Sequence, residues 1–478
     1  MVVKNYLYNL MYQIISIILP IITIPYVSRI LGPSGLGEYA LTSTYAQYFV
    51  LFGMIGLSMY CGREIAYVRD DKNKLSRTFW ELNILRFITM GITIVIYLIM
   101  FCFVIKTSNR LLLIVQSTIL FSCLFDISWL FVGIEDFKTV AIRNTVVKAI
   151  GVILIFLLIK KSNQVVLYAF ILGITQLIGQ IIMWFDIPKE IKFIKPINKN
   201  LIKHLKNSIG LFIPQIAITV YTMLDKVMLG LMTNDAQVGL YDNSQRIIKL
   251  SITIVTTLAT VTVPKMANLY AKDNIEEFAK NAYKSFSFVS FLALPMAFGL
   301  IGVSETFVGW FFGPGFEEIK PMFYIGAWLM VTLSWSSIVG SQVLISIRRE
   351  KMFTIAVVSG AILNVILNFI LIKKFQGIGT TIASVAAEFL GMFIMVYFTK
   401  DILKIKKLFK SVPKYFIASL IMFIPIFILG KVLKVSIITT AIQVVVGVSV
   451  YIGIMIITKD KNLMFMFSYI EKFINKKR

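Results

Sequence analysis

Apolar runs of about 20 residues recur from one end of this chain to the other. A helical run of that length crosses the roughly 30 Å hydrocarbon core of a bilayer. The chain of 478 residues is 58% hydrophobic and 15% charged, whereas soluble proteins carry about 25% charged residues. The sequence therefore predicts an all-α polytopic membrane protein. We predict fourteen spans, near residues 10–31, 39–61, 84–105, 111–132, 144–159, 164–186, 208–232, 239–263, 283–302, 322–347, 353–372, 378–399, 414–430 and 436–457.

The net charge of +24 follows the predicted membrane topology. If both termini are cytoplasmic, most of the 48 lysines and arginines fall in inner segments, as the positive-inside rule requires. The orientation of the chain in the membrane thus explains its positive net charge, and we do not expect nucleic acid as a partner. The first run follows Lys4 and precedes further spans, so we expect it to remain as a helix and not to be a cleaved signal peptide.

Two parts of the sequence match each other in parallel. At an offset of 202 residues Gly37 falls on Gly239, and at an offset of 213 the run at 152–161 falls on the run at 365–374. Parallel halves are typical of transporters, with the substrate path between them. We predict a six-helix bundle at 1–186, a basic cytoplasmic linker at 187–207, a second bundle at 208–400, and helices 13 and 14 with a basic tail at 401–478.

Charged residues lie inside two neighbouring predicted spans, 208–232 and 239–263. Asp225 and Lys226 lie in the first, and Asp242, Arg246 and Lys249 lie in the second with the spacing i, i+4, i+7 of one helical face. With these bounds, Asp225 and Arg246 each lie about 10 Å from the helix end nearest the connecting turn. Ionisable groups at such depth are costly unless they pair or face water, so a hydrated cavity is indicated. The alternative is that they pair only to join helices.

Four further charges are weaker site candidates. Arg29 and Arg63 lie at helix ends, where each either contributes to the cavity or acts as an interfacial or topological charge. Asp126, predicted in the inner third of helix four, and Glu388, near the middle of helix twelve, either pair with a cavity cation or carry a coupling proton. A purely structural pairing is the alternative for both.

The sequence contains no motif for nucleotide hydrolysis, nucleophilic catalysis or metal binding. The chain has no GxxxxGK[ST] phosphate loop, no nucleophile constellation and no metal-ligand spacing among its three cysteines. Its one histidine, His204, falls in the lysine-rich linker. We therefore predict a transporter without cofactor or metal, and not an enzyme. A membrane polysaccharide polymerase or glycosyltransferase is the alternative from another class.

The two spans carry one more positive charge than negative, which favours an anionic substrate. The cations are Lys226, Arg246 and Lys249, and the anions are Asp225 and Asp242. Arginine suits phosphate because its guanidinium donates as a fork. Three stretches then carry a family resemblance: PYVSRILGPSGLGEY, REIAYVRDDK, and DKVMLG followed by VGLYDNSQRI. With these, the chain resembles the Wzx-type oligosaccharide-lipid flippases of the multidrug/oligosaccharidyl-lipid/polysaccharide exporter superfamily.

The resemblance implies two six-helix bundles around a cationic cavity in a bacterial cytoplasmic membrane. The implied substrate is an undecaprenyl-diphosphate-linked oligosaccharide repeat unit for surface or capsular polysaccharide or O-antigen, moved from the inner to the outer leaflet. Membrane lipids, a polymerase and glycosyltransferases are the implied partners. Related flippases place cavity arginines on helices one, two and eight, where this sequence has Arg29, Arg63 and Arg246. A cation-coupled multidrug exporter and a peptidoglycan lipid-precursor flippase are the alternatives.

Overall fold

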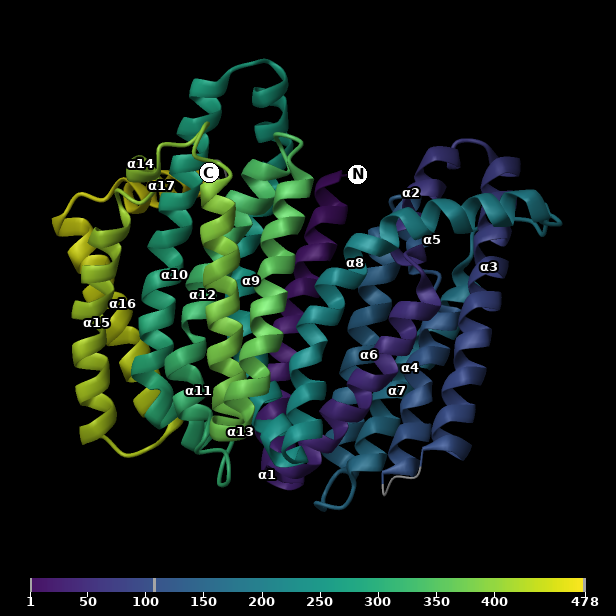
Figure 1. Ribbon diagram of the computed structural model, residues 1–478, viewed down its shortest axis with the longest axis horizontal. Coiled ribbons are helices and arrows are strands. Elements are labelled where there is room, and N and C mark those ends of the chain that lie inside the picture. The colour runs from purple at the N-terminus through teal and green to yellow at the C-terminus, as the bar shows by residue number, and fades with distance from the viewer. Residues whose placement is uncertain (1, 106–108, 476–478) are drawn as a thin grey trace. The chain divides into compact units, whose positions relative to one another are not determined.

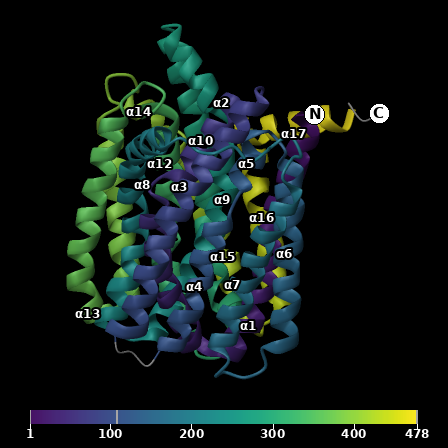
Figure 2. The ribbon, with the colours of Figure 1, turned by 90° about the vertical axis from the view of Figure 1, so that its right-hand side faces the viewer.

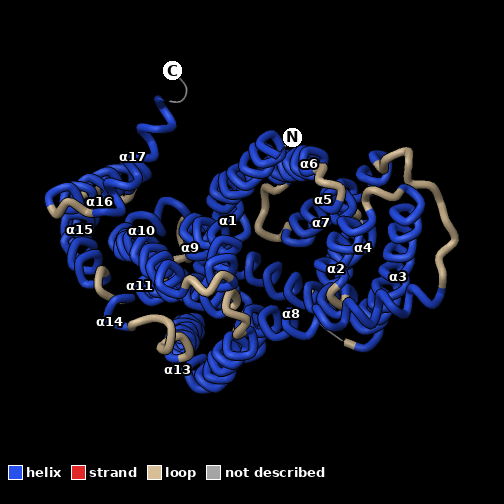
Figure 3. Tube along the Cα trace, turned by 90° about the horizontal axis from the view of Figure 1, so that it is seen from above, coloured by secondary structure: helices blue, strands red, loops and turns tan. Residues whose placement is uncertain are grey.

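The protein is helical throughout the part of the chain that the structure describes. This computed structural model describes residues 2–105 and 109–475, and within them no strand occurs (Figure 3). Ten of the described helices are long and apolar enough to cross a membrane. The all-α polytopic prediction is therefore confirmed.

The chain divides into two compact units, which we describe separately. Unit 1 comprises Met1–Gly239 and unit 2 comprises Leu240–Arg478. The helices of unit 1 are α1 (Val2–Met54), α2 (Leu57–Val68), α3 (Lys72–Ile99), η1 (Met100–Val104), α4 (Arg110–Phe125), α5 (Ser128–Gly133), α6 (Phe137–Leu158), α7 (Val165–Ile182), η2 (Met183–Asp186) and α8 (Asn198–Met232).

Helix α9 (Asp235–Ala271) begins at the end of unit 1 and continues into unit 2. The other helices of unit 2 are α10 (Ile275–Phe311), α11 (Ile319–Gly326), α12 (Trp328–Ser336), η3 (Ser337–Leu344), α13 (Glu350–Tyr397), α14 (Ile405–Leu408), α15 (Val412–Val432), α16 (Ile437–Ile457) and α17 (Lys461–Asn475) (Figure 1).

Two long helices each contain a sharp break. In α1 the backbone at Gly32 has a φ of 67°, a left-handed value that glycine adopts without strain. In α13 the break is at Gln376, where φ is 49°. Each of these helices covers all of one predicted apolar run and most of a second, and α8 and α9 cover one run each. The count of fourteen spans and the domain boundaries of the parallel repeat stay predictions.

A close contact between two glycines fixes the start of α9. A Cβ added at Gly37 would overlap the carbonyl oxygen of Asp235, and one added at Gly239 would overlap the carbonyl oxygen of Pro33. The two backbones therefore approach each other more closely than any side chain would permit. These are the two glycines that the sequence repeat aligns.

The segment after η2 lies against α3. The indole Nε1 of Trp80 donates to the carbonyl oxygen of Lys192 at 3.2 Å, and the Lys192 N–H donates to Ser76 Oγ at 3.2 Å. Helix α8 then begins at Asn198, within the segment that we predicted as linker. The basic segment, which belongs to unit 1, is thus fastened to α3 by two hydrogen bonds.

In unit 2, α10 packs against α15 and α16. Helix α17 runs across the direction of α16 and not along it (Figure 2). On α17 the side chain of Leu463 is buried, whereas Met464 and Phe465 are each 60% exposed. Such an amphipathic helix at the end of a membrane span is typical of the membrane–water interface.

Candidate functional site: charged faces of α8 and α9

The turn between α8 and α9 places the predicted charges. Helix α8 ends at Met232, as predicted, but α9 begins at Asp235 and not at 239. The physical reason is a cap: the side-chain oxygen of Asn234 accepts from the N–H of Gln237 at 3.1 Å, which satisfies one of the open donors of the first turn. Arg246 therefore lies about 17 Å from the start of α9, roughly one turn further from that start than the sequence predicts.

Arg246 is held by the preceding turn of its own helix. Its Nε lies 2.8 Å from Asp242 Oδ2, and the side chains of Arg246 and Asp242 are 40% and 8% exposed. Lys249 is exposed on the next turn. This face of α9 thus combines one buried carboxylate with two cations that reach the surface. The pairing orients the guanidinium and leaves the face with a net positive charge.

The two charges on α8 lie in unit 1. Asp225 is buried and Lys226 is half-buried. Adjacent helical residues point about 100° apart, so the two side chains leave α8 in different directions. That they share one cavity with the α9 charges stays a prediction.

The remaining arginine candidates are exposed. Arg29 is exposed on α1. Arg63 lies on α2, with its Nη2 3.8 Å from Glu64 Oε1 and its Cζ 5.6 Å from the centre of the Tyr60 ring. These positions suit an interfacial cation as well as a binding residue, so their assignment to the site stays a prediction.

The sequence placed Asp126 inside a helix, and this is wrong. Helix α4 ends at Phe125, and Asp126 has an extended backbone with ψ of 109°. Its carboxylate accepts from the N–H of Ser128 at 2.8 Å, at the start of α5. Asp126 therefore stabilises a local turn between two helices. Glu388 lies half-buried within α13, as expected.

Sequence reasoning missed a buried cation, Arg86 on α3. Its side chain is fully buried, Nη2 donates to Asn83 Oδ1 at 2.5 Å, and Nε and Nη1 have no hydrogen-bond partner. Its Cζ lies 5.5 Å from the centre of the Trp129 ring. Arg86 is not among the site residues that the sequence predicts. The available signal was its place three residues after Asn83, at the start of an apolar run.

Sequence reasoning also missed a polar network around His204. This residue lies on α8, is 8% exposed, and its ring nitrogens lie 2.8 Å from Tyr60 Oη and 3.4 Å from Glu81 Oε2. The other oxygen of Glu81 accepts from Asn200 Nδ2 at 2.9 Å and from the Ile197 N–H at 3.1 Å. A buried carboxylate thus joins α3 to the start of α8. In the described residues, no group of three or more His, Cys, Asp or Glu side chains could hold a metal ion.

Comparison with known proteins identifies the class. A family model described as "Polysaccharide biosynthesis protein" matches residues 2–270. The chain therefore belongs to the polysaccharide biosynthesis protein family. This confirms the resemblance to the Wzx-type flippases that the sequence motifs carry.

Two relatives illustrate the likeness in sequence. The "Putative O-antigen transporter" of Escherichia coli (strain K12) is 22% identical over 402 residues, covering 83% of this chain and 96% of that protein. The "Probable low-salt glycan biosynthesis flippase Agl15" of Haloferax volcanii is 22% identical over 202 residues, covering 42% of this chain and 43% of that protein.

Two solved structures share the fold. "Lipid II flippase MurJ, inward closed conformation" has a TM-score of 0.73 at 16% identity, covering 96% of this chain and 99% of that chain. An "inward-facing conformation of a multidrug resistance MATE family transporter" has a TM-score of 0.66 at 14% identity, covering 82% of this chain and 96% of that chain. At these identities the likeness concerns the fold alone.

Proposed function

We propose that this protein is a flippase. It carries an undecaprenyl-diphosphate-linked oligosaccharide repeat unit from the inner to the outer leaflet of a bacterial cytoplasmic membrane, by alternating access. Family membership is the observation that carries this proposal. The O-antigen transporter among the relatives and the lipid-flippase fold support it.

The face of α9 supplies the chemistry for the head group. Arg246 offers a forked donor to a diphosphate, and Lys249 adds a point charge one turn further along. Asp242 holds Arg246 by Nε at 2.8 Å. That contact orients the guanidinium before substrate arrives, which lowers the cost of ordering it during binding.

An apolar groove in unit 2 provides a place for the lipid tail. It has a volume of about 450 Å³, and its lining includes Leu292, Gly299, Met330, Met422, Val448 and Met466. The head group cannot enter hydrocarbon, and the tail need not leave it. A protein that binds the head group while a groove holds part of the tail therefore avoids both transfer costs.

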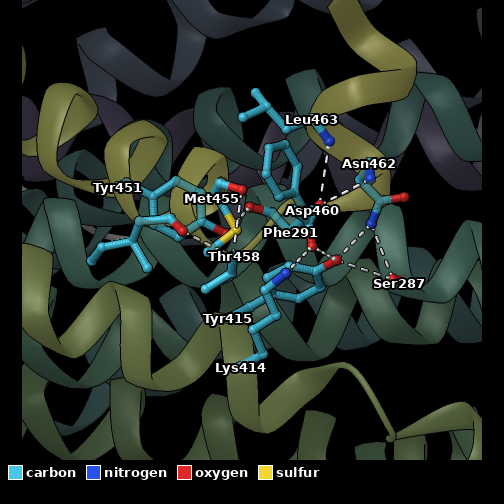
Figure 4. Close-up of polar contacts among 11 residues, drawn as sticks. Ser287, Phe291, Lys414, Tyr415, Tyr451, Met455, Thr458, Asp460, Asn462 and Leu463 are labelled. Atoms are coloured by element: carbon cyan, nitrogen blue, oxygen red, sulfur yellow. Dashed lines mark hydrogen bonds and ion pairs between the residues drawn. The ribbon is translucent and has the colours of Figure 1, made fainter.

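Helix α17 contributes Leu463 and Met466 to the lining of this groove, and Asp460 fixes the start of this helix. The Asp460 carboxylate accepts from Lys414 Nζ at 2.7 Å, from Tyr415 Oη at 3.0 Å and from the N–H of Asn462 at 2.9 Å (Figure 4). Burial raises the pKa of Asp460, but these bonds outweigh burial and hold the pKa below its ordinary value. The carboxylate therefore stays ionised at neutral pH and keeps Leu463 on the groove.

Filling the groove should impair transport without unfolding the protein. A Cβ at Gly299 would meet only Met422 Cε, at 3.9 Å, so we expect Gly299→Phe to project into the groove. Loss of contact with two or three methylenes of the tail costs about 2 kcal/mol, or roughly 30-fold in binding. The measurement is the transport rate at limiting substrate. Gly453→Phe is the matched control, because a Cβ at Gly453 has no neighbour within 4 Å and this residue does not line the groove.

The energy for export does not come from nucleotide hydrolysis by this chain, because its sequence has no phosphate loop. An inside-negative potential favours outward movement of the anionic head group by about 2.3 kcal/mol per charge per 100 mV. Removal of the product on the outer side adds to this drive.

Complementation distinguishes flipping from drug export, the second candidate that the multidrug-transporter fold suggests. The gene is expressed in a bacterium that lacks its own polysaccharide repeat-unit flippase and makes the matching repeat unit. We expect surface polysaccharide to be restored, and resistance to cationic drugs to be unchanged. Drug resistance without restored polysaccharide would contradict the proposal.

A further inference from the structure

A second groove lies in unit 1 between α6 and α7, helices that pack against each other (Figures 1 and 3). Its volume is about 660 Å³. Each wall is a row of apolar side chains spaced four residues apart, one row on α6 and one on α7. We call each row a ladder. These ladders are Ile142, Val146 and Ile150 on α6, and Ile174, Ile178 and Ile182 on α7.

The apolar ladders are exposed. Ile142, Val146, Ile178 and Ile182 have exposed fractions of 45%, 49%, 49% and 47%. The α6 wall extends to Leu154, so it is about 18 Å long from Ile142. One leaflet contributes about 15 Å of hydrocarbon. The groove thus has the length of one acyl chain.

One end of the groove is charged. Asp136 and Lys138 lie at the start of α6, and Asp186 lies at the end of η2, which follows α7. Because consecutive spans are antiparallel, these residues meet at the same end. Arg143, half-buried, donates from Nη2 to Met183 Sδ, which holds the guanidinium against that end of α7.

This charged end holds two cations and two carboxylates. Both carboxylate oxygens of Asp136 already accept from Thr139 at the start of α6, Oδ1 from its N–H at 3.3 Å and Oδ2 from its hydroxyl at 2.6 Å. Within the described chain, Lys138 and Asp186 form no ion pair, although both line the groove. Two unpaired charges of opposite sign beside an apolar groove match a ligand that carries both signs.

We propose that this groove binds one zwitterionic aminophospholipid of the surrounding leaflet. Lys138 and Arg143 would receive its phosphate. Asp186, and Asp136 through its remaining lone pairs, would accept from its primary ammonium, and one acyl chain would lie between the two apolar ladders. The four side chains sum to zero charge. A neutral head group with a phosphate and an ammonium therefore fits better than an anionic head group, which would leave both carboxylates facing negative charge.

Native mass spectrometry of the purified full-length protein tests this site. The probes are phosphatidylethanolamine, phosphatidylglycerol and phosphatidylcholine with identical acyl chains, added at increasing concentration. We expect phosphatidylethanolamine to bind on the order of tenfold more tightly than the other two, because only its ammonium donates hydrogen bonds to the carboxylates. Asp186→Asn should reduce this preference, and Lys138→Gln should weaken the binding of phosphatidylethanolamine and phosphatidylglycerol alike.

Two tryptophan variants distinguish lipid binding in the groove from non-specific lipid binding elsewhere on the protein. Val146→Trp fills the groove and should abolish the preference. Ile153→Trp changes a residue of the same helix that is 57% exposed and lies outside the lining, so it should leave the preference intact. Equal binding of the three lipids to the unmodified protein would overturn the proposal. So would identical behaviour of the two tryptophan variants.

Discussion

Replacement of Arg246 by alanine is expected to abolish restoration of surface polysaccharide, while the protein still inserts into the membrane. The side chain is the forked cation on the face of α9 that also carries Asp242 and Lys249, and it is 40% exposed. Hydrogen bonds to charged groups contribute about 1.5–3 kcal/mol each, so the loss of one or two lowers binding by roughly 10- to more than 1,000-fold. The measurement is polysaccharide on the cell surface, normalised to the amount of protein in the membrane.

Arg246→Ala also leaves the buried carboxylate of Asp242 without its 2.8 Å contact, so a second variant must separate transport from folding. Arg246→Gln keeps a side-chain N–H that can donate to Asp242 but removes the positive charge. We expect it to fold normally and to fail in transport. Lys265→Ala is the matched control, because Lys265 is an exposed cation on the same helix that bonds to Asn281 Oδ1 at 3.2 Å. Normal polysaccharide from Arg246→Gln would remove Arg246 from the site.

Replacement of Gly37 by alanine is expected to destabilise unit 1 by about 3 kcal/mol or more, because overpacking against backbone is harder to relieve than the 1–3 kcal/mol typical of side-chain crowding. The added Cβ would overlap the carbonyl oxygen of Asp235 and lie 2.8 Å from the nitrogen of Gly239. The first turn of α9 would have to move. The measurement is the melting temperature of the purified protein, together with its yield as a monodisperse species.

Gly91→Ala is the control for this prediction. Gly91 lies within α3, and a Cβ there meets nothing within 4 Å. Alanine is favoured over glycine inside helices by about 1 kcal/mol, so this variant should be as stable as the original protein or slightly more stable. If Gly37→Ala melts at the same temperature as Gly91→Ala, the close approach of the two backbones at Gly37 is not as described.

The apolar runs predicted the fold class because the bilayer imposes one strong rule. A span must be helical and about 20 residues long, and both properties are visible in the order of residues. The end of α8 at Met232 was predicted correctly. The start of α9 was placed four residues late, since hydropathy marks where the membrane begins but not where the Asn234 cap starts the helix.

The charges were predicted less well, because their roles depend on neighbours far away in the chain. Arg86 and Glu81 are not among the predicted site residues, yet both are buried. Glu81 contacts residues more than 110 positions away on the chain, and no local pattern indicates that contact. His204 was assigned to a loop and lies instead on α8 between Tyr60 and Glu81. In contrast, the i, i+4 spacing of Asp242 and Arg246 is local, and their pairing could be read from one helix.

Transport by the purified protein in sealed vesicles tests the binding of a diphosphate by α9 most directly. Fluorescent undecaprenyl-linked sugars are supplied in diphosphate and monophosphate forms, and the rate at which each reaches the opposite leaflet is measured for the original protein and for Arg246→Gln. We expect the original protein to move the diphosphate form at least about tenfold faster than the monophosphate form, and Arg246→Gln to lose that preference. Equal rates for the two lipids with the original protein, or an unchanged preference in Arg246→Gln, would contradict the account.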